Sequence, residues 1–434
     1  MSELKRHMGL FQITMYGIGL ILGAGIYVLI GEAAGLAGDA VWISFVLAAI
    51  VAVIAGLSYA ELSSVFPKAA AEYTFIKNSF KSNFLGFIIG WLTAITSIIT
   101  ASVVALGFGG YLADFIDLPI VISAILLLGA LSVINFFGIR ESSWTNIVLT
   151  LVEVAGLVII IYIGFTFAAP EPVNYFESPT GLSGIVIAFV LIFFAFIGFE
   201  DMANVAEEVK KPSRTIPKAI LISISITGVV YVLVSLAAVR VVSWQDLGSS
   251  AAPLAAVAER ALGSGGHVLL SSIALFATTN TVLIILIAGA RILYGMASDR
   301  SLPSPLGKIH LKTKTPWIAV IGIMLASMAF AFVGDIVLVA NISVFAIVIT
   351  FAMVNLAVIV LRYTEPTIAR PFRVPLNIGK FPILPLFGLG FSAYMGFQFE
   401  LPVLAVGGGI IGTGILFYII YTRHKKNLQP DEAE

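Results

Sequence analysis

The sequence predicts an all-α integral membrane protein with twelve transmembrane helices. Three observations carry this prediction. Of the 434 residues, 59% are hydrophobic, and the mean hydropathy is +1.05. Charged residues make up only 11% of the chain, whereas soluble domains carry about 25%. Apolar runs of roughly 20 residues, the length that a helix needs to cross about 30 Å of hydrocarbon, recur along the whole chain.

The expected spans follow one another with short polar connections. None of the connections exceeds about two dozen residues, so we expect residues 1–434 to form a single membrane domain. The spans lie at about 11–37, 40–62, 83–113, 118–136, 146–168, 183–206, 217–239, 266–296, 317–333, 337–361, 381–399 and 401–422.

The distribution of Lys and Arg predicts the orientation, because these residues gather in the cytoplasmic segments of membrane proteins. With the N-terminus in the cytoplasm, 22 of the 24 Lys and Arg residues fall on the cytoplasmic side. Only Arg240 and Arg260 fall outside. We therefore expect a multi-pass protein of the cell membrane with both termini in the cytoplasm.

The first span contains a glycine-rich run at residues 17–25 that is poorly suited to a continuous helix. Unpaired backbone groups at membrane depth are tolerated only where they face protein or a water-filled cavity, and transporters use such breaks to bind solutes. Close helix packing explains the glycines equally well when they are taken alone. Gly19 with Gly23, and Gly31 with Gly35, also fit the small-xxx-small pattern of packed membrane helices.

A second interruption, at residues 196–200 in the sixth span, favours the binding-site interpretation. Five spans separate the two breaks, and an odd offset inverts the topology. We therefore expect a five-plus-five inverted repeat with a site at the interface of the broken helices. Residues 11–168 would form the first repeat, residues 183–361 the second, and residues 381–422 two extra helices.

The broken helix ends predict a zwitterionic ligand. One broken end presents unpaired N–H groups and positive character, and the other presents unpaired C=O groups and negative character. We expect N–H groups near Ala24 and Gly25 to bind a carboxylate, because small residues let the ligand approach the backbone. The carbonyls near Ile21 and Ile197 would bind an ammonium group.

Aromatic and acidic side chains surround the second break. Phe194 is the candidate lid over the ligand, and Phe196 and Gly198 belong to the expected lining. Glu200 follows the break directly and is a further candidate for ligand contact. A pocket lined by Ala, Ile, Phe and Val without a base favours a ligand with a neutral side chain over one with an acidic side chain. Glu200 is also compatible with a ligand that has a cationic side chain.

Glu153 is the clearest deeply placed ionisable residue. It lies on the order of 10 Å into the fifth span, where an ionised carboxylate is costly without a cation, so it is a candidate proton carrier. In a sodium alternative, ionised Glu153 joins carbonyls near Gly19 and a hydroxyl such as that of Thr279. In a structural alternative, protonated Glu153 is hydrogen-bonded to Thr279 or Asn280.

The composition argues against an enzyme or a metal site. The chain has no Cys, and we expect no cofactor other than a coupling ion, H⁺ or Na⁺. The four histidines lie in connections or at span ends, so no intramembrane cluster is available for metal binding or acid–base catalysis. They are His7, His267, His310 and His424.

Five sequence motifs resemble those of the amino acid, polyamine and organocation transporter superfamily, of the amino acid permease type. The resemblance spans nearly the whole chain. The motifs are GLILGAGIY at 19–27, YAELSSVFPKAAAEY at 59–73, NFFGIR at 135–140, FAFIGFEDMANVAEEVKKPSRTIPKAI at 194–220 and RPFRVP at 370–375.

The resemblance implies the inverted-repeat fold first associated with bacterial leucine transporters, and amino acid transport by alternating access. It places Gly23, Ala24 and Gly25 on the substrate carboxylate. One departure concerns the fifth span, where several relatives have a buried Lys and this chain has Glu153. The sign of the charge is reversed, although proton coupling remains compatible with it.

The sequence therefore predicts a secondary active amino acid transporter, working as a proton-coupled symporter. Amino acid exchange and sodium-coupled symport are the alternatives, and a transport-like nutrient sensor or a channel is more remote. The expected partners are the amino acid and the lipid bilayer, with no nucleic acid. The sequence leaves monomer and homodimer open.

Overall fold

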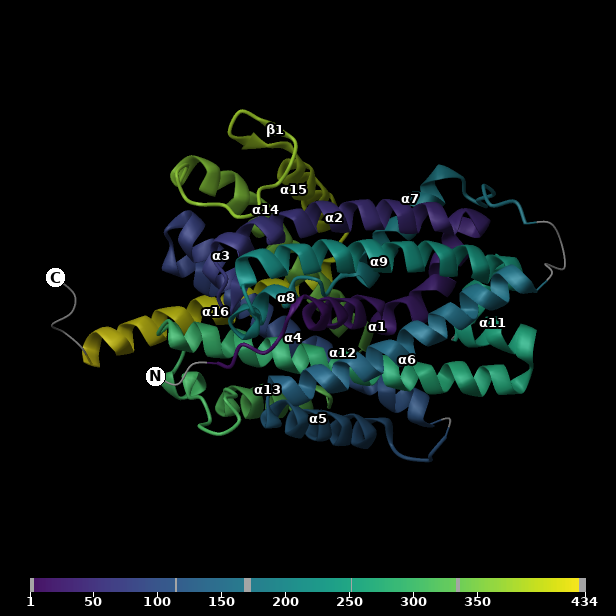
Figure 1. The fold of residues 1–434 in the computed structure, drawn as a ribbon, viewed down its shortest axis with the longest axis horizontal. Helices are drawn as coiled ribbons and strands as arrows, with labels where there is room; N and C mark the ends of the chain where they lie inside the picture. Colours follow the sequence, from purple (N-terminus) through teal and green to yellow (C-terminus); the bar gives the residue numbers. More distant parts are fainter. Residues whose placement is uncertain (1–3, 114, 168–172, 251, 333–335, 429–434) are drawn as a thin grey trace.

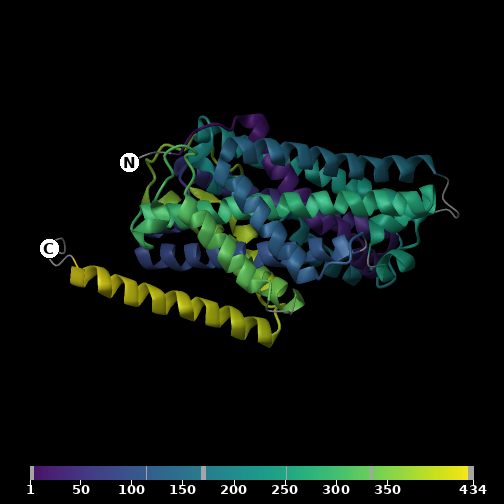
Figure 2. The same ribbon diagram turned by 90° about the horizontal axis from the view of Figure 1, so that it is seen from below.

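The computed structural model describes residues 4–113, 115–167, 173–250, 252–332 and 336–428. Long helices run side by side along one direction and form an elongated bundle (Figure 1). The two described ends of the chain lie at the same end of this bundle (Figures 1 and 2). We call it the terminal end.

Helices occupy all the expected spans, and shorter elements lie between them. The elements of the first half are α1 (Leu10–Ala37), the 3₁₀ turn η1 (Gly38–Ala40), α2 (Val41–Val65), α3 (Ala71–Phe80), α4 (Asn83–Ala113), α5 (Ile120–Phe137), α6 (Ile139–Thr166), α7 (Leu182–Phe193), η2 (Phe194–Phe196), α8 (Asp201–Asn204) and η3 (Ala206–Glu208). Those of the second half are α9 (Pro212–Val241), α10 (Trp244–Ser249), α11 (Pro253–Leu262), α12 (Ser264–Ser298), η4 (Ser304–Gly307), α13 (Trp317–Phe330), α14 (Ile336–Thr364), β1 (Asn377–Ile378), β2 (Phe381–Pro382), α15 (Ile383–Gly396) and α16 (Leu401–Leu428).

The all-α membrane class is confirmed. Within the described residues, ten helical segments are long and apolar enough to cross a bilayer. Two further expected spans coincide with α13 and α15, which have 14 residues each and fall short of the roughly 20 that a straight crossing needs. The count of twelve spans and the inverted repeat therefore stay predictions.

Three short helices, α3, α10 and α11, occupy stretches that hydropathy assigns to connections. Local signals start two of them: Ser243 caps α10 by accepting the Asp246 N–H at 3.2 Å, and Pro253 starts α11. The C-terminal helix α16 differs from the rest because it lies along the outside of the bundle (Figure 2). Only 17% of its most apolar stretch is buried, as expected of a surface that faces lipid.

Both predicted helix breaks are present. In α1, Gly23 leaves the helical conformation with φ −22° and ψ −157°. In the sixth span, α7 gives way to a 3₁₀ turn, extended Ile197 and Gly198 at φ 124°, a conformation that favours glycine. A Cβ on Gly198 would lie 2.6 Å from the Leu20 side chain, so the second break packs directly on the first.

Candidate functional site

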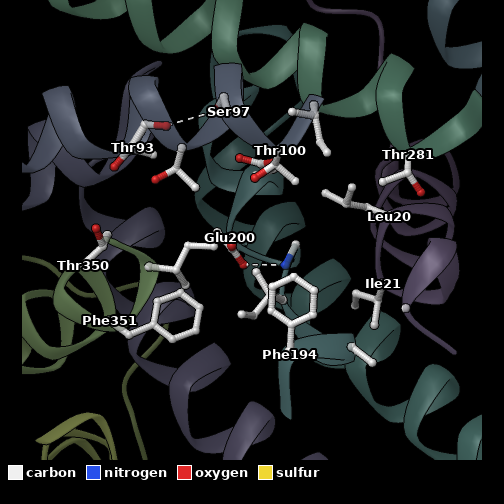
Figure 3. Close-up of a pocket in the computed structure, with 18 of the residues that line it drawn as sticks. Leu20, Ile21, Thr93, Ser97, Thr100, Phe194, Glu200, Thr281, Thr350 and Phe351 are labelled. Carbon is white, nitrogen blue, oxygen red and sulfur yellow. Dashed lines mark hydrogen bonds between the residues drawn. The ribbon is translucent and has the colours of Figure 1, made fainter. Parts of the chain in front are cut away.

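A cavity of about 130 Å³ lies between the two breaks and the helices that flank them, and Figure 3 shows part of its lining. One buried water needs only about 10–15 Å³, so the cavity has room for a small organic ligand. Its lining residues come from α1, α2, α3, α4, the second break, α8, α12 and α14.

The structure brings most of the expected substrate residues to this cavity. Those that line it are Ile21, Gly25, Phe194, Ile197, Gly198 and Glu200. Phe196 instead packs its ring against Tyr231, with ring centroids 5.1 Å apart. Gly23 forms the backbone break behind the lining, and the side chain of Ala24 lies outside what the structure describes. Gly25 also packs tightly, because a Cβ there would lie 3.1 Å from Ala195.

Tyr231 of α9 links the two breaks, and sequence reasoning missed it. Its hydroxyl lies within hydrogen-bond distance of the Ile21 carbonyl and, at 3.1 Å, of the Ala195 carbonyl. The single hydrogen of this hydroxyl is shared between a carbonyl at each break, which lowers the cost of backbone groups left without helical partners at membrane depth. The Ile21 carbonyl, expected to meet an ammonium group, accepts from this hydroxyl and has a second lone pair that a ligand can use.

A polar face of α4 also lines the cavity, although it was not predicted. Thr93, Thr96, Ser97 and Thr100 follow the i, i+3, i+4, i+7 spacing of one helix face. Figure 3 labels Thr93, Ser97 and Thr100. That spacing inside an otherwise apolar span is a signal the sequence offered. The Thr100 hydroxyl has no hydrogen-bond partner among the described residues, so it is available to a ligand.

Three carboxyl groups line the cavity, and no Lys, Arg or His is among the described lining residues. Glu200 folds back so that its Oε2 accepts the Gly198 N–H at 2.8 Å, and Asp201 follows it. Glu72, which was missed, comes from α3 and is 1% exposed. Neither of its carboxyl oxygens, nor the hydroxyl of neighbouring Tyr59, has a partner with hydrogen-bonding geometry in the described structure.

Burial raises the pKa of Glu72 to about 7. The pKa is lowered in part by three nearby polar groups, but burial outweighs them; these are its own backbone N–H, Asn204 and Tyr59. Asn204 also ties α8 to α3, because its Oδ1 accepts the Ala71 N–H at 2.8 Å. A carboxyl group that changes charge near neutral pH thus faces the cavity from a helix outside the predicted spans.

The proposed ion-coupling residue Glu153 lies in a buried polar network between α6 and α12. Asn280 donates to Glu153 Oε2 at 3.5 Å and to the Thr150 hydroxyl at 2.9 Å, and Asn146 donates to Asn280 at 2.9 Å. The Oε1 of Glu153 has no partner among the described residues. The structure thus brings Glu153 and Asn280 together.

Of the other two expected ion-coupling residues, only Gly19 reaches this network. A Cβ on Gly19 would overlap Thr150 and Asn280, so α1 approaches the network closely at this point. Thr279 is not brought together with Glu153, because its hydroxyl donates to the Leu275 carbonyl of its own helix at 2.7 Å.

Comparison with known proteins identifies the family of the chain. The sequence profile of the family described as "Amino acid permease" matches residues 8–421. The chain belongs to the amino acid permease family. Family and relatives are transporters, so the permease is not an enzyme.

The relatives carry different substrate names. The permease is 29% identical to the branched-chain amino acid permease BcaP of Bacillus subtilis, over 98% of this chain and 95% of that protein. It is also 29% identical to the methylthioribose transporter of the same organism, over 97% and 94%. A third relative at 29% identity is the vacuolar cationic amino acid transporter 4 of Arabidopsis thaliana, over 84% and 64%.

Polar contacts join several segments of the permease. Buried Arg291 of α12 donates through Nε and Nη2 to the Glu208 carboxylate at 2.9 and 3.0 Å, and through Nη1 to Asn135 at 2.7 Å. Met8 pairs with Val209 as an isolated β-bridge. These contacts hold together the N-terminal segment, the chain at η3, α5 and α12.

Proposed function

We propose that the permease is a proton-coupled amino acid symporter of the cell membrane, working by alternating access with both termini in the cytoplasm. Glu153 would carry the proton, and the two inverted repeats would move against each other around the breaks. The observation that supports this most is the burial of Glu153 without a cation. Only Asn280 reaches its carboxyl oxygens among the described side chains, so an ionised carboxylate would be costly there and a proton removes that cost.

Sodium coupling is the second candidate, and one observation favours it. The Oδ1 of Asn146, like the Oε1 of Glu153, is buried without a hydrogen-bond partner among the described residues. Two free oxygens in one polar network, beside a broken helix, are the kind of ligands that bind Na⁺ in transporters. Ionised Glu153 would then neutralise the bound cation.

For the substrate, we propose an amino acid whose carboxylate meets the backbone N–H groups of Gly23, Ala24 and Gly25. The lining differs from the apolar one that favoured a neutral side chain, because Glu72 and Asp201 join Glu200 around the cavity. Three carboxyl groups without a neighbouring base attract positive charge. We therefore extend the proposal to amino acids with cationic side chains, with Phe194 closing over them.

The decisive experiment is uptake by purified protein in proteoliposomes. Labelled lysine, arginine, leucine and alanine are offered under an imposed proton gradient, an imposed sodium gradient, or neither. We expect the proton gradient to drive accumulation, the sodium gradient to have no effect, and lysine or arginine to accumulate most. Glu153→Gln should abolish accumulation, whereas the control Glu32→Gln, at an exposed carboxylate, should leave it intact.

Accumulation driven by sodium and indifferent to the proton gradient would replace the proton mechanism with the sodium one. Accumulation by Glu153→Gln at the wild-type level would assign Glu153 a structural role. If none of the amino acids binds or moves, the proposed substrate class is wrong.

A further inference from the structure

A second cavity lies in the loop between α14 and α15, and it shares no lining residue with the cavity between the breaks. It has a volume of about 290 Å³. Figure 1 places the β1–β2 hairpin, which borders it, at the outer edge of the bundle beside α15 and toward the terminal end. The residues that line it are Arg362, Pro366, Ile368, Arg370, Arg373 and Lys380.

Four cations line this cavity, and among the described residues one carboxylate, that of Glu61, pairs with two of them. Glu61 of α2 accepts from Arg362 Nε and Nη2 at 2.7 and 2.6 Å and lies 3.3 Å from Arg370 Nε. Arg373 and Lys380 are exposed and have no hydrogen bond or ion pair within the described parts of the chain. The cavity therefore carries surplus positive charge.

The pKa of Arg370 reflects this surplus. Burial lowers it, and the positive charges of Arg362 and Arg373 lower it further against the attraction of Glu61. The neighbouring acid Glu365 does not correct the imbalance, because it pairs with Lys81 at 2.8 Å.

One of the four cations, Arg370, is held in place by backbone carbonyls. Arg370 donates through its guanidinium to the carbonyls of Leu361 at 3.0 Å, Glu365 at 2.8 Å and Ile368 at 3.0 Å. Glu61 also accepts the Val374 N–H at 2.8 Å, which ties the loop to α2. Arg362 and Arg370 are therefore fixed before an anion arrives, so this part of the cavity loses little conformational freedom on binding. Lys and Arg are enriched in cytoplasmic loops in general, but this enrichment does not explain why the cations here surround a cavity and why Arg370 is fixed by backbone groups.

Apolar side chains stand exposed next to the cations. Leu376 is 64% exposed and Ile378 is 72% exposed, both on or beside the short hairpin. Leu376 holds a left-handed conformation with φ 58°, which is unfavourable for a residue with a branched side chain. Exposed apolar residues beside basic ones, at the edge of a membrane protein, match the boundary between acyl chains and head groups.

We propose that this cavity binds the phosphate head group of an anionic membrane lipid. Arg373 and Lys380 contact the phosphate, and Leu376 and Ile378 enter the acyl region. The proposed orientation places the terminal end in the cytoplasm, where the leaflet is rich in anionic lipid and basic pockets beside membrane helices bind head groups. The choice of leaflet rests on the proposed orientation, but the residues and ligand of this site take no part in the proposed transport cycle.

The test measures lipid binding to the full chain in detergent. Phosphatidylglycerol and phosphatidylcholine are titrated separately, and bound lipid is counted by native mass spectrometry. Arg373→Gln combined with Lys380→Gln should raise the apparent Kd for phosphatidylglycerol roughly 30-fold. The matched control is Lys308→Gln with Lys312→Gln, which removes two exposed cations from the connection between α12 and α13.

The control should leave the affinity unchanged, and phosphatidylcholine binding should respond to neither variant. Ile378→Ser keeps all the charges and should still weaken phosphatidylglycerol binding, which separates a lipid from a free anion. Equal loss in the two double variants would show nonspecific attraction and overturn the site. The lipid proposal would be wrong if inorganic phosphate bound as tightly as the lipid and Ile378→Ser had no effect. The cavity would then be a site for a free anion.

Discussion

Replacing Glu72 with Gln should make the stability of the permease less dependent on pH. Burial raises the pKa of Glu72 from its ordinary 4.5 to about 7, a difference of about 2.5 pH units. At about 1.4 kcal/mol per unit, the buried carboxylate costs the folded state about 3 kcal/mol once it is ionised.

The sign of this effect follows from which state holds the proton more tightly. The folded-state pKa lies above the unfolded one, so the contribution of Glu72 to stability is fully present below about pH 4.5. This contribution is lost as the pH rises to about 7, and above that pH Glu72 causes no further change in stability. Glu72→Gln does not titrate, so its stability relative to wild type should increase across the same interval.

The assay is the melting temperature of detergent-solubilised protein between about pH 5 and about pH 8. We expect the melting temperature of Glu72→Gln to rise by about 3–6 °C relative to wild type across this range. The shift is modest because each kcal/mol changes the melting temperature of a long chain by fewer degrees than that of a small domain. Glu32→Gln, at an exposed carboxylate, should give a curve parallel to wild type. Parallel curves for Glu72→Gln, or a variant that melts lower than wild type at high pH, would refute the assigned cost of burial.

Three further predictions concern packing, ion pairing and binding. Gly19→Ala drives a methyl group into the polar network of α6 and α12, so a melting assay should show a loss of stability of about 1–3 kcal/mol, and uptake should stop. The control Gly408→Ala places its methyl group in open space and should change neither stability nor uptake. Arg291→Leu leaves the buried Glu208 carboxylate without its partner and should lower stability by about 3–5 kcal/mol. Lys81→Ala, in an exposed ion pair, should lower stability by less than about 1 kcal/mol, and equal losses would contradict this reasoning. Thr100→Val should weaken substrate binding, measured by isothermal titration, with an unchanged melting temperature; unchanged affinity would place the ligand elsewhere.

Hydropathy and glycine placement by themselves determine much of this protein. Lipid offers no partners to backbone groups, so the long apolar runs must be helices. The glycine-rich run at 17–25 and the interruption at 196–200 mark the places where the helices stop. The depth of Glu153 within an apolar span likewise follows from counting residues, because the rise per residue of a helix is fixed.

Only the tertiary structure decided which side chains meet at those breaks. Thr279 and Asn280 are neighbours in sequence, yet the rotation of α12 in the bundle gives Asn280 to the Glu153 network and leaves Thr279 bonded to its own helix. Glu72 reaches the cavity from a short helix in a connection, and Tyr231 reaches both breaks from α9. Helix rotation and loop docking depend on packing between elements distant in sequence, which no local pattern encodes.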